Sequence, residues 1–395
     1  MIFVPSPVAW RRDGTPGGLS LLERQLKQLR KLDDGSALLL VPVGDPEPVL
    51  PNACDSIAIA RVPRGTTDLG AALAAAPMLP RASLALAADR LVDLRVLRAL
   101  AGAGVTTFAT LDGAIPEPVA WVRAADVRRY GAGIASHAER FALTSLDPYS
   151  PELRGTAEPY VLPCATADER SDAWRVLLDH VQKRSLDLPG QYFDTPFENF
   201  LVRRLAPTNV TPNQITLLTL VVAAVVAALF HHGWLRIGVL LGLVVGVLDG
   251  VDGKLARLKL QTSKLGELEH VGDFFYENGW YLSLASYLSR APTRGGLWYA
   301  GLVIVACDLA DSLLYLVAQR RTGRMLDELT TFDRRFRAIA GRRNVYVMIF
   351  VVGFFAGHPD VAFFTAVAWA VCTVAVHASR VGWVLVTAPY LRPAE

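Results

Sequence analysis

The pattern of apolar and polar positions changes near residue 205. Beyond that point, six stretches are apolar and long enough to cross a bilayer as helices, each of which needs about 20 residues. They cover residues 213–231, 235–256, 265–289, 295–319, 344–357 and 360–387. The second and third stretches also contain carboxylates near one end, and the fifth has a short apolar core. The pattern therefore predicts an all-α domain of six transmembrane helices.

The first half of the chain alternates short β-like runs with helical ones. Strands are expected in the segments MIFVP, SALLLVPV, SIAIARV, ASLALAA and TTFATL, and helices such as LSLLERQLKQLRKL fall between them. This alternation is typical of an α/β domain with a mainly parallel sheet. We therefore expect an α/β domain at 1–187, an amphipathic connector at 188–212 that lies along the membrane surface, and the helical domain at 213–395.

Basic residues in the loops orient the predicted helices. The linker between the fourth and fifth helices is rich in arginine, and the linker between the second and third also carries cations. The arginines of the first linker are Arg320, Arg321, Arg324, Arg334, Arg335, Arg337, Arg342 and Arg343. The opposite loops are short and contain few cations. Since positive loops stay in the cytoplasm, both termini and the α/β domain are expected there.

Composition narrows the function classes. The formal net charge of +3 is too small to indicate a nucleic-acid partner. The four cysteines form no CxxC pair, so neither disulfides nor thiolate metal sites are expected. The initial segment MIFVPSPVAWRRDG lacks the basic and apolar layout of a cleaved signal peptide.

Four carboxylates cluster where the second and third predicted helices meet the cytoplasm. Asp249 and Asp252 are three residues apart, and Glu269 and Asp273 are four apart, so each pair lies on one helix face. A single acid near a helix end often reaches only for water. Four acids on two adjacent helices repel one another unless cations neutralise them. Hard oxygen ligands favour Mg²⁺, Mn²⁺ or Ca²⁺ at this place.

The segment DGVDGKLARLKLQTSKLGELEHVGD resembles the signature of the CDP-alcohol phosphotransferase family. The matching positions are Asp249, Asp252, Gly253, Ala256, Arg257 and Gly266. The resemblance implies a six-helix membrane enzyme, usually a homodimer, with a two-metal site for Mg²⁺ or Mn²⁺. Such an enzyme transfers a phosphoalcohol group from a CDP-alcohol to an acceptor alcohol and releases CMP.

The resemblance also assigns roles by position. Asp249 and Asp252 would be metal ligands, and Asp249 would lie near the nucleotide as well. Glu269 and Asp273 would complete the metal site, and Asp273 would be the general base that takes the proton of the acceptor hydroxyl. The nucleotide site would be lined by Gly253, Ala256, Arg257 and Gly266.

The acids after Gly266 depart from the family pattern. The family has GxxxDxxxD, whereas this chain has GELEHVGD. Strict counting selects His270 and Phe274, and phenylalanine cannot bind a metal. Keeping the helical spacing selects Glu269 and Asp273, with the segment one residue short, and we prefer this alignment. His270 is then a metal ligand, a substrate contact or an ordinary hydrogen-bonded histidine.

Other charged residues of the helical half have two interpretations. Arg342 and Arg343 belong to the topology signal, yet arginine at this place also suits a phosphate on the acceptor. Asp308 lies inside the fourth predicted helix, as does Asp311, and both would be costly if they faced lipid. We expect them to face the bundle interior or a water-filled cavity. Pairing with Arg380 or His377 on the sixth helix is the simplest explanation.

The order of strands and helices in the first half resembles sugar-phosphate nucleotidyltransferases, which have a Rossmann-type sheet. Active members carry a glycine-rich phosphate loop after the first strand, and the segment SPVAWRRDGTPGG lacks its tight glycine spacing. Asp89 lies where the family's metal-binding aspartate would be, although a lone aspartate after a strand is usually a helix cap. These departures favour an inactive or regulatory domain over an active one.

The two halves together resemble bifunctional enzymes that make CDP-inositol and then di-inositol phosphodiesters in prokaryotic membranes. A polyol phosphate such as inositol phosphate is therefore one candidate acceptor, and a phospholipid head group is another. Two alternatives stay open: a nucleotidyltransferase whose membrane half is an anchor, and a transporter or channel. The acid set argues against the first. The position of the acids at the cytoplasmic rim, with no visible internal repeat, argues against the second.

Overall fold

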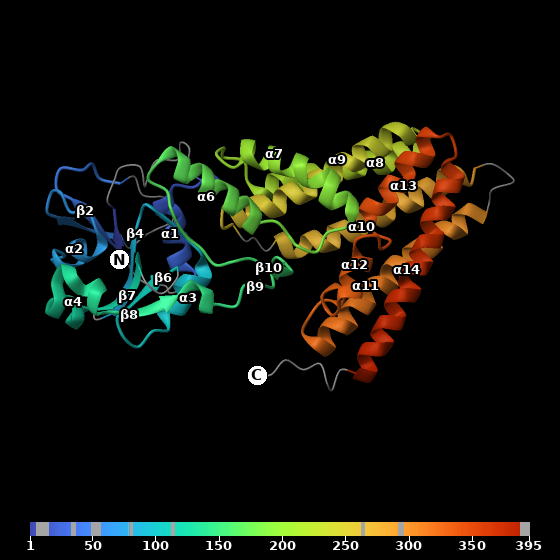
Figure 1. Cartoon of the computed structure of the whole chain (residues 1–395). Helices are drawn as coiled ribbons and strands as arrows, with labels where there is room; N and C mark the ends of the chain where they lie inside the picture. Colours follow the sequence, from blue (N-terminus) through green and yellow to red (C-terminus); the bar gives the residue numbers. More distant parts are fainter. Residues whose placement is uncertain are drawn as a thin grey trace. The chain divides into compact units, whose positions relative to one another are not determined.

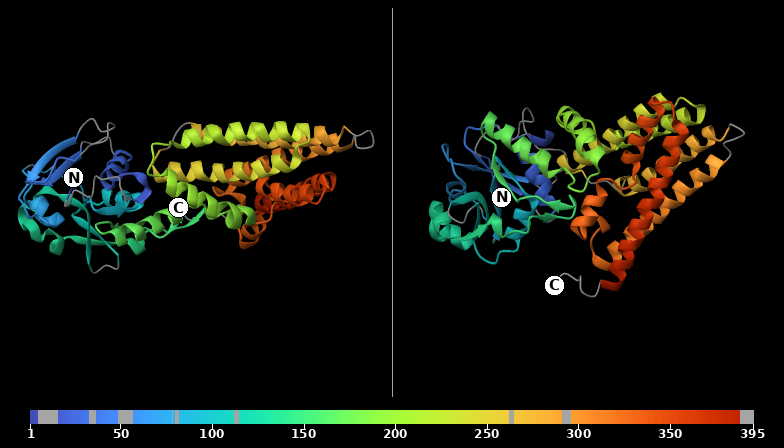
Figure 2. Two further views of the ribbon diagram at one scale, coloured as in Figure 1. Left: turned by 90° about the horizontal axis from the view of Figure 1, so that it is seen from above. Right: turned by 45° about the vertical axis from the view of Figure 1, so that its right-hand side comes forward.

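The chain folds into two compact units. The computed structural model describes residues 1–4, 16–32, 37–48, 57–77, 79, 82–111, 115–261, 265–290 and 296–387, with the backbone alone at 16 and 265–271. The first unit comprises 1–182, 205–209 and 257–260, and the second comprises 183–204, 210–256 and 261–395. The first contains the sheet and the second the long helices (Figure 1, Figure 2).

The first unit is built on a seven-stranded sheet in the order β3-β2-β1-β4-β7-β6-β8. The strands are β1 (Ile2–Phe3), β2 (Ala37–Pro42), β3 (Ile57–Val62), β4 (Ala82–Ala87), β6 (Thr107–Thr110), β7 (Pro116–Arg123) and β8 (Glu139–Ala142). The α/β class and the five expected strands are confirmed. The sheet is mixed, however, because β7 runs antiparallel to β4 and β6. Sequence reasoning missed β7, whose prolines at 116 and 118 are unusual inside a sheet.

Helices cover both faces of this sheet. They are α1 (Leu21–Arg30), α2 (Leu69–Ala74), α3 (Leu94–Ala101), α4 (Ala124–Tyr130) and α5 (Ile134–His137). A further helix, α6 (Ala167–His180), packs against residues 16–18 and 161–163. Ile2 and Leu39 pack with α1 and α3, whereas the next residues along the strands, Phe3 and Leu40, pack with α2, α4 and α5. Strand side chains alternate between the faces, so each strand contributes to two apolar layers.

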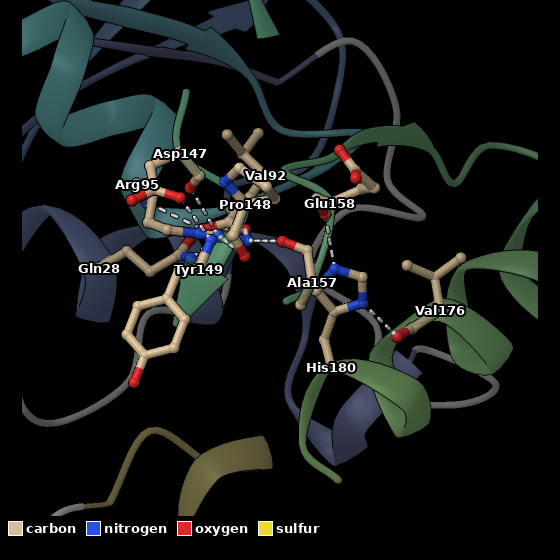
Figure 3. Close-up of polar contacts among 11 residues, drawn as sticks. Gln28, Val92, Arg95, Asp147, Pro148, Tyr149, Ala157, Glu158, Val176 and His180 are labelled. Atoms are coloured by element: carbon tan, nitrogen blue, oxygen red, sulfur yellow. Dashed lines mark hydrogen bonds and ion pairs between the residues drawn. The ribbon is translucent and has the colours of Figure 1, made fainter. Parts of the chain in front are cut away.

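Polar contacts hold the irregular segment that follows β8 (Figure 3). Arg95 of α3 forms an ion pair of 2.7 Å with Asp93 and donates at 2.8 Å to the carbonyl of Ala157. His180, at the end of α6, places Nε2 2.6 Å from the carbonyl oxygen of Glu158. The segment includes short antiparallel pairs of β9 (Tyr149–Ser150) with β10 (Gly155–Thr156) and of β11 (Val161–Pro163) with β5 (Arg90–Val92).

The second unit is helical. Its helices are α7 (Thr195–Leu205), α8 (Pro212–His232), α9 (Leu235–Leu258), α10 (Leu265–Leu288), α11 (Gly296–Thr322), α12 (Thr331–Arg337), α13 (Arg343–Phe355) and α14 (Pro359–Thr387). Helices are present at all six predicted stretches. Among the described residues, α8, α11 and α14 are long and apolar enough to cross a membrane, and α13 is a shorter apolar helix. Charged residues such as Asp249, Asp252 and Lys254 lie in α9, and six spans stay a prediction.

Aromatic side chains fill the core of the helical unit. Phe230, Trp280, Phe350 and Phe363 are each at most 2% exposed and belong to one cluster. Trp280 of α10 also donates from Nε1 to the carbonyl of Ala223 on α8 at 2.8 Å. This bond satisfies the one polar atom of a buried indole and joins two helices that pack along their length (Figure 2).

Gly250 on α9 lets Glu198 of α7 approach closely. A Cβ atom built on Gly250 would lie 2.0 Å from Oε1 of Glu198. Glu198 is buried and pairs at 2.8 Å with Lys254, which is 1% exposed. The opposite face of the segment exposes aromatic rings, at Tyr192 and Phe200 among others. The connector is thus amphipathic in an unusual sense, because its acids are buried and its aromatic residues face outward.

We predict that Gly250→Ala destabilises the helical unit by about 1–3 kcal/mol, because the added methyl group displaces Glu198 from its buried pair with Lys254. Thermal unfolding in detergent measures the effect. Gly279→Ala on α10 is the matched control, since its new Cβ meets no described atom within 4 Å outside the local helix backbone, and it should gain up to about 1 kcal/mol from helix propensity. Equal melting temperatures for the two variants would contradict the prediction.

Candidate active site

Arg343 joins three helices of the second unit at the predicted acidic site. It lies at the first position of α13, and its Nη2 is 2.6 Å from Oδ2 of Asp249 on α9. Its Nη1 is 3.3 Å from Oε1 of Glu277 on α10 and also donates to the hydroxyl of Tyr276. The Arg343 side chain is 11% exposed. Buried charges are tolerated when they are paired and hydrogen-bonded, and this guanidinium has two carboxylates around it.

Asp252 is held by a different neighbour from that of Asp249. It is 2% exposed, and its Oδ2 accepts a hydrogen bond of 2.8 Å from Thr216 Oγ1 on α8. The two aspartates of the DxxD motif therefore lie on one helix but face α13 and α8 respectively. Gly253 and Ala256 follow on α9 and are half-buried. Both aspartates lie in α9 as expected, whereas a metal site that they share stays a prediction.

The acids of α10 are described in part. Asp273 is half-buried and lies one helical turn before Glu277. Gly266, Glu269 and His270 belong to the backbone of α10, and their side chains lie outside the described residues. Among the side chains that the structure does place, no three acids, histidines or cysteines converge to hold a metal. The predicted four-carboxylate site is therefore not tested.

Glu277 is a member of this site that the sequence signature did not indicate. It continues the four-residue spacing of Glu269 and Asp273 by one more turn of α10. This spacing is the sequence signal that points to Glu277. The ion pair with Arg343, which comes from another helix, places Glu277 in the site.

Asn344 extends the site to the segment before α7. Its Nδ2 donates to Asp194 at 3.1 Å and to Asp187 at 3.4 Å, while its Oδ1 accepts from Arg343 Nε at 3.3 Å. Asp194 is 3% exposed. Burial raises the pKa of Asp194 to about 7, and the neighbouring carboxylates of Glu198 and Asp187 add to the effect.

Arg342 and Arg343 point to different surroundings although they are adjacent. Arg342 is the N-cap residue of α13, and its guanidinium lies 5.8 Å from the ring centroid of Tyr315 on α11. A third arginine of the linker, Arg337, is 7% exposed and pairs with Asp327 at 3.2 Å. At least part of the arginine-rich linker is thus packed inside the unit.

Asp308 and Asp311, the two acids inside α11, both contact polar side chains of other helices. Asp311 lies 2.5 Å from His377 Nδ1 on α14, so the predicted pairing with His377 is confirmed. Asp308 accepts a hydrogen bond of 2.7 Å from Asn278 on α10. Arg380, the alternative partner, pairs instead with Asp333 of α12 at 2.7 Å. These contacts remove the cost of polar groups within apolar helices.

Two other predicted residues belong to the first unit. Arg257, in the last turn of α9, donates from Nε to the carbonyl of Val181 at 2.8 Å. Asp89 lies between β4 and β5, so the expectation that it caps a helix is wrong. It lines a cavity of about 250 Å³ together with Arg90 and Glu117. Burial raises the pKa of Asp89, and the charge of Arg90 partly offsets this effect.

Comparison with known proteins identifies the class of the helical half. Residues 209–376 match the model of the CDP-alcohol phosphatidyltransferase family. The chain therefore carries a CDP-alcohol phosphatidyltransferase domain, and the predicted family is confirmed. The matched segment includes the acids of α9 and α10 as well as Arg342 and Arg343.

Two curated relatives match part of the chain. The bifunctional IPC transferase and DIPP synthase of Rubrobacter xylanophilus is 29% identical over 163 residues, which is 40% of this chain and 34% of the relative. The protein of the same name from Thermococcus kodakarensis is 30% identical over 149 residues, or 38% and 33%. The chain thus spans about a third of the length of these curated relatives.

A solved structure is also similar in part. It is the phosphatidylinositol phosphate synthase of Mycobacterium tuberculosis with CDP-DAG bound, at 19% identity and a TM-score of 0.37. The similarity covers 48% of this chain and 93% of that one.

We predict that Asp194→Asn stabilises the protein more at pH 8 than at pH 5. Folded Asp194 keeps its proton up to a pKa of about 7, whereas an ordinary aspartate ionises near 3.8. The folded state therefore binds more protons between these values, and the stability contributed by this group falls as the pH rises. Asparagine removes that loss and can still accept from Asn344. Melting temperatures at both pH values test this, with exposed Asp172→Asn as the control; a gain independent of pH would count against it.

Proposed function

We propose that the chain transfers a phosphoalcohol group from a CDP-alcohol to an acceptor alcohol and releases CMP. The observation that carries the proposal is the motif from Asp249 to Arg257 on α9, which lies inside the segment matched by the family. The burial of Asp252 and the pairing of Asp249 with Arg343 support a role beyond solvation at a helix end.

The proposal includes a two-metal site for Mg²⁺ or Mn²⁺. The donor set fits these ions, because the residues that would hold them, Asp249, Asp252, Glu269 and Asp273, supply hard carboxylate oxygens. Bound there, the metal would neutralise the diphosphate and make CMP a better leaving group. Asp249 is paired with the cation Arg343. This pairing is consistent with a cluster of carboxylates that needs positive charge nearby.

The protein's own groups would complete the transfer. Asp273 would take the proton from the acceptor hydroxyl, while Gly253, Ala256, Arg257 and Gly266 would contact the nucleotide. Arg342 and Arg343 would bind a phosphate on the acceptor, since both residues lie at the start of α13. His270 would lie near the same substrate. Arg343 would have to share its hydrogen bonds between this phosphate and its carboxylates.

Features of the second unit support lipid-facing chemistry. An apolar groove of about 890 Å³ runs between α13 and α14, lined by Val345, Met348, Ala362 and Trp369 among others. Such a groove suits the acyl chains of a membrane lipid. A polyol phosphate such as inositol phosphate or a phospholipid head-group alcohol would be the acceptor.

The proposal extends to topology and assembly. Six spans with both termini in the cytoplasm would place the acids at the inner face of a prokaryotic membrane, in a homodimer. The outward aromatic residues of α7 and of the turn before it, with Arg203 and Arg204 nearby, support attachment of this segment to the membrane surface.

A second function is favoured by the cavity of the first unit. Asp89, Arg90 and Glu117 line it at the carboxyl ends of β1 and β4, where α/β proteins usually bind ligands. A nucleotidyltransferase anchored by the helical half would use this cavity. Release of pyrophosphate from CTP and a polyol phosphate, abolished in Asp89→Asn and retained in Asp273→Asn, would support it.

We predict that purified protein in detergent with Mn²⁺ releases CMP from CDP-diacylglycerol or CDP-inositol when inositol phosphate or glycerol phosphate is added. Asp273→Asn should lower the rate about a hundredfold or more, because the general base is lost. Exposed Asp172→Asn is the control. A wild-type rate in Asp273→Asn would exclude Asp273 as the base.

We further predict that Arg343→Met lowers the melting temperature and that Mn²⁺ restores more of it than in the wild type. The substitution leaves Asp249 and Glu277 without the cation between them, which costs about 3–5 kcal/mol when a buried pair is broken. A divalent ion replaces that charge. Arg342→Met, which removes a contact with Tyr315, should show the ordinary Mn²⁺ shift. Equal shifts in the two variants would contradict this prediction.

A further inference from the structure

The end of α9 is closed by an unusual set of hydrogen bonds. The backbone N–H of Gln261 donates to the carbonyl of Ala256 at 2.9 Å, and the backbone N–H of Leu260 donates to the carbonyl of Arg257 at 3.4 Å. These bonds form a Schellman motif, in which the residue at the position of Leu260 is usually glycine. Leu260 adopts a positive φ of 53° there. The motif leaves the next two carbonyls, of Leu258 and Lys259, to find other donors.

Those two donors come from α1. Arg24 donates from Nη2 to the carbonyl of Leu258 at 2.5 Å, and Lys27 donates from Nζ to that of Lys259 at 3.4 Å. The contacts lie within the first unit, which includes residues 257–260. Since the last carbonyls of a helix lack partners inside the helix, cationic side chains at this place act as a cap.

Arg24 is buried to an extent that requires an explanation. It is 3% exposed, and no carboxylate in the described part of the chain lies within ion-pair distance of it. The nearest acid in sequence, Glu23, pairs with Lys27 at 3.3 Å. A buried guanidinium is costly without opposite charge. The partial negative charge at the C-terminal end of α9 supplies it.

Two glycines make room for this arrangement. Gly17 has a φ of +77°, and a Cβ atom there would lie 2.2 Å from Nη2 of Arg24. Gly18 has a φ of +71°, and its Cβ would lie 1.8 Å from the carbonyl oxygen of Ala206. In an active nucleotidyltransferase, glycines after the first strand would receive phosphate. Here Gly17 leaves room for the Arg24 side chain, and Gly18 leaves room for the backbone of segment 205–209.

Further bonds fix the same turn of α9. Lys259 donates from Nζ to the carbonyl of Thr208 at 2.8 Å, and Arg257 donates to Val181. The turn is therefore tied to α1, to the residue after α6 and to the segment 205–209.

We propose that Arg24 is a positioning residue of the phosphotransferase site and that the first unit serves to cap α9. The capping stands on the contacts above, whereas its consequence for catalysis rests on the proposed function. Arg257 lies in the capped turn, and Asp252 and Asp249 precede it by roughly one and two turns. Loss of the cap frays this end, and small displacements of aligned groups slow a reaction strongly.

The test compares Arg24→Met with Arg24→Lys and with Lys31→Met, an exposed control at the end of α1. Hydrogen–deuterium exchange of the full chain in detergent measures the amides of 253–261. In Arg24→Met we expect these to exchange roughly tenfold faster, with α3 unchanged. CMP release should fall about tenfold. Arg24→Lys should recover most of both effects, and Lys31→Met should match the wild type.

The outcomes separate this inference from the proposed function. Unchanged exchange at 253–261 in Arg24→Met overturns the capping, whatever the activity. Faster exchange with full CMP release overturns the positioning role. Faster exchange in a protein whose wild type releases no CMP supports the cap and counts against the proposed function. If Arg24→Met does not fold, Lys27→Met, whose side chain is 24% exposed, must show faster exchange at 257–261 or the inference fails.

Discussion

The ion pairs of Arg343 with Asp249 and Glu277 hold α13, α9 and α10 together at the acidic site. In a medium of low dielectric, each of these groups would be costly alone, so the three helices have to meet where the charges meet. Asn344, the next residue of α13, transmits the same constraint to Asp194 before α7. The polar site thus fixes helix positions that apolar packing alone would leave free to slide.

The glycines of α9 are the counterpart of this constraint. Glu198 of α7 can reach Lys254 because no side chain at Gly250 stands in its way. Glu198 then pairs with Lys254, one turn beyond Gly250. Glycine weakens the interior of a helix. At position 250 the close approach of α7 stabilises the fold by more than the low helix propensity of glycine costs.

Local patterns predicted the elements, and they failed where distant partners decide. The apolar stretches and the spacing from Asp249 to Asp273 depend on neighbours in sequence, so the helices and the family could be predicted. The antiparallel β7 depends on strands on both sides of it. The choice of His377 for Asp311 and of Asp333 for Arg380 depends on how α11, α12 and α14 pack. No pattern along the chain contains that information.

The end of α9 depends on side chains that are distant in sequence. A glycine at position 260 would close the helix at little conformational cost. The chain instead places Leu260 in a left-handed conformation and takes donors from α1 for the remaining carbonyls. Arg24 in turn has its counter-charge in that helix end. The end of the helix that carries the acids is therefore completed by donors from α1.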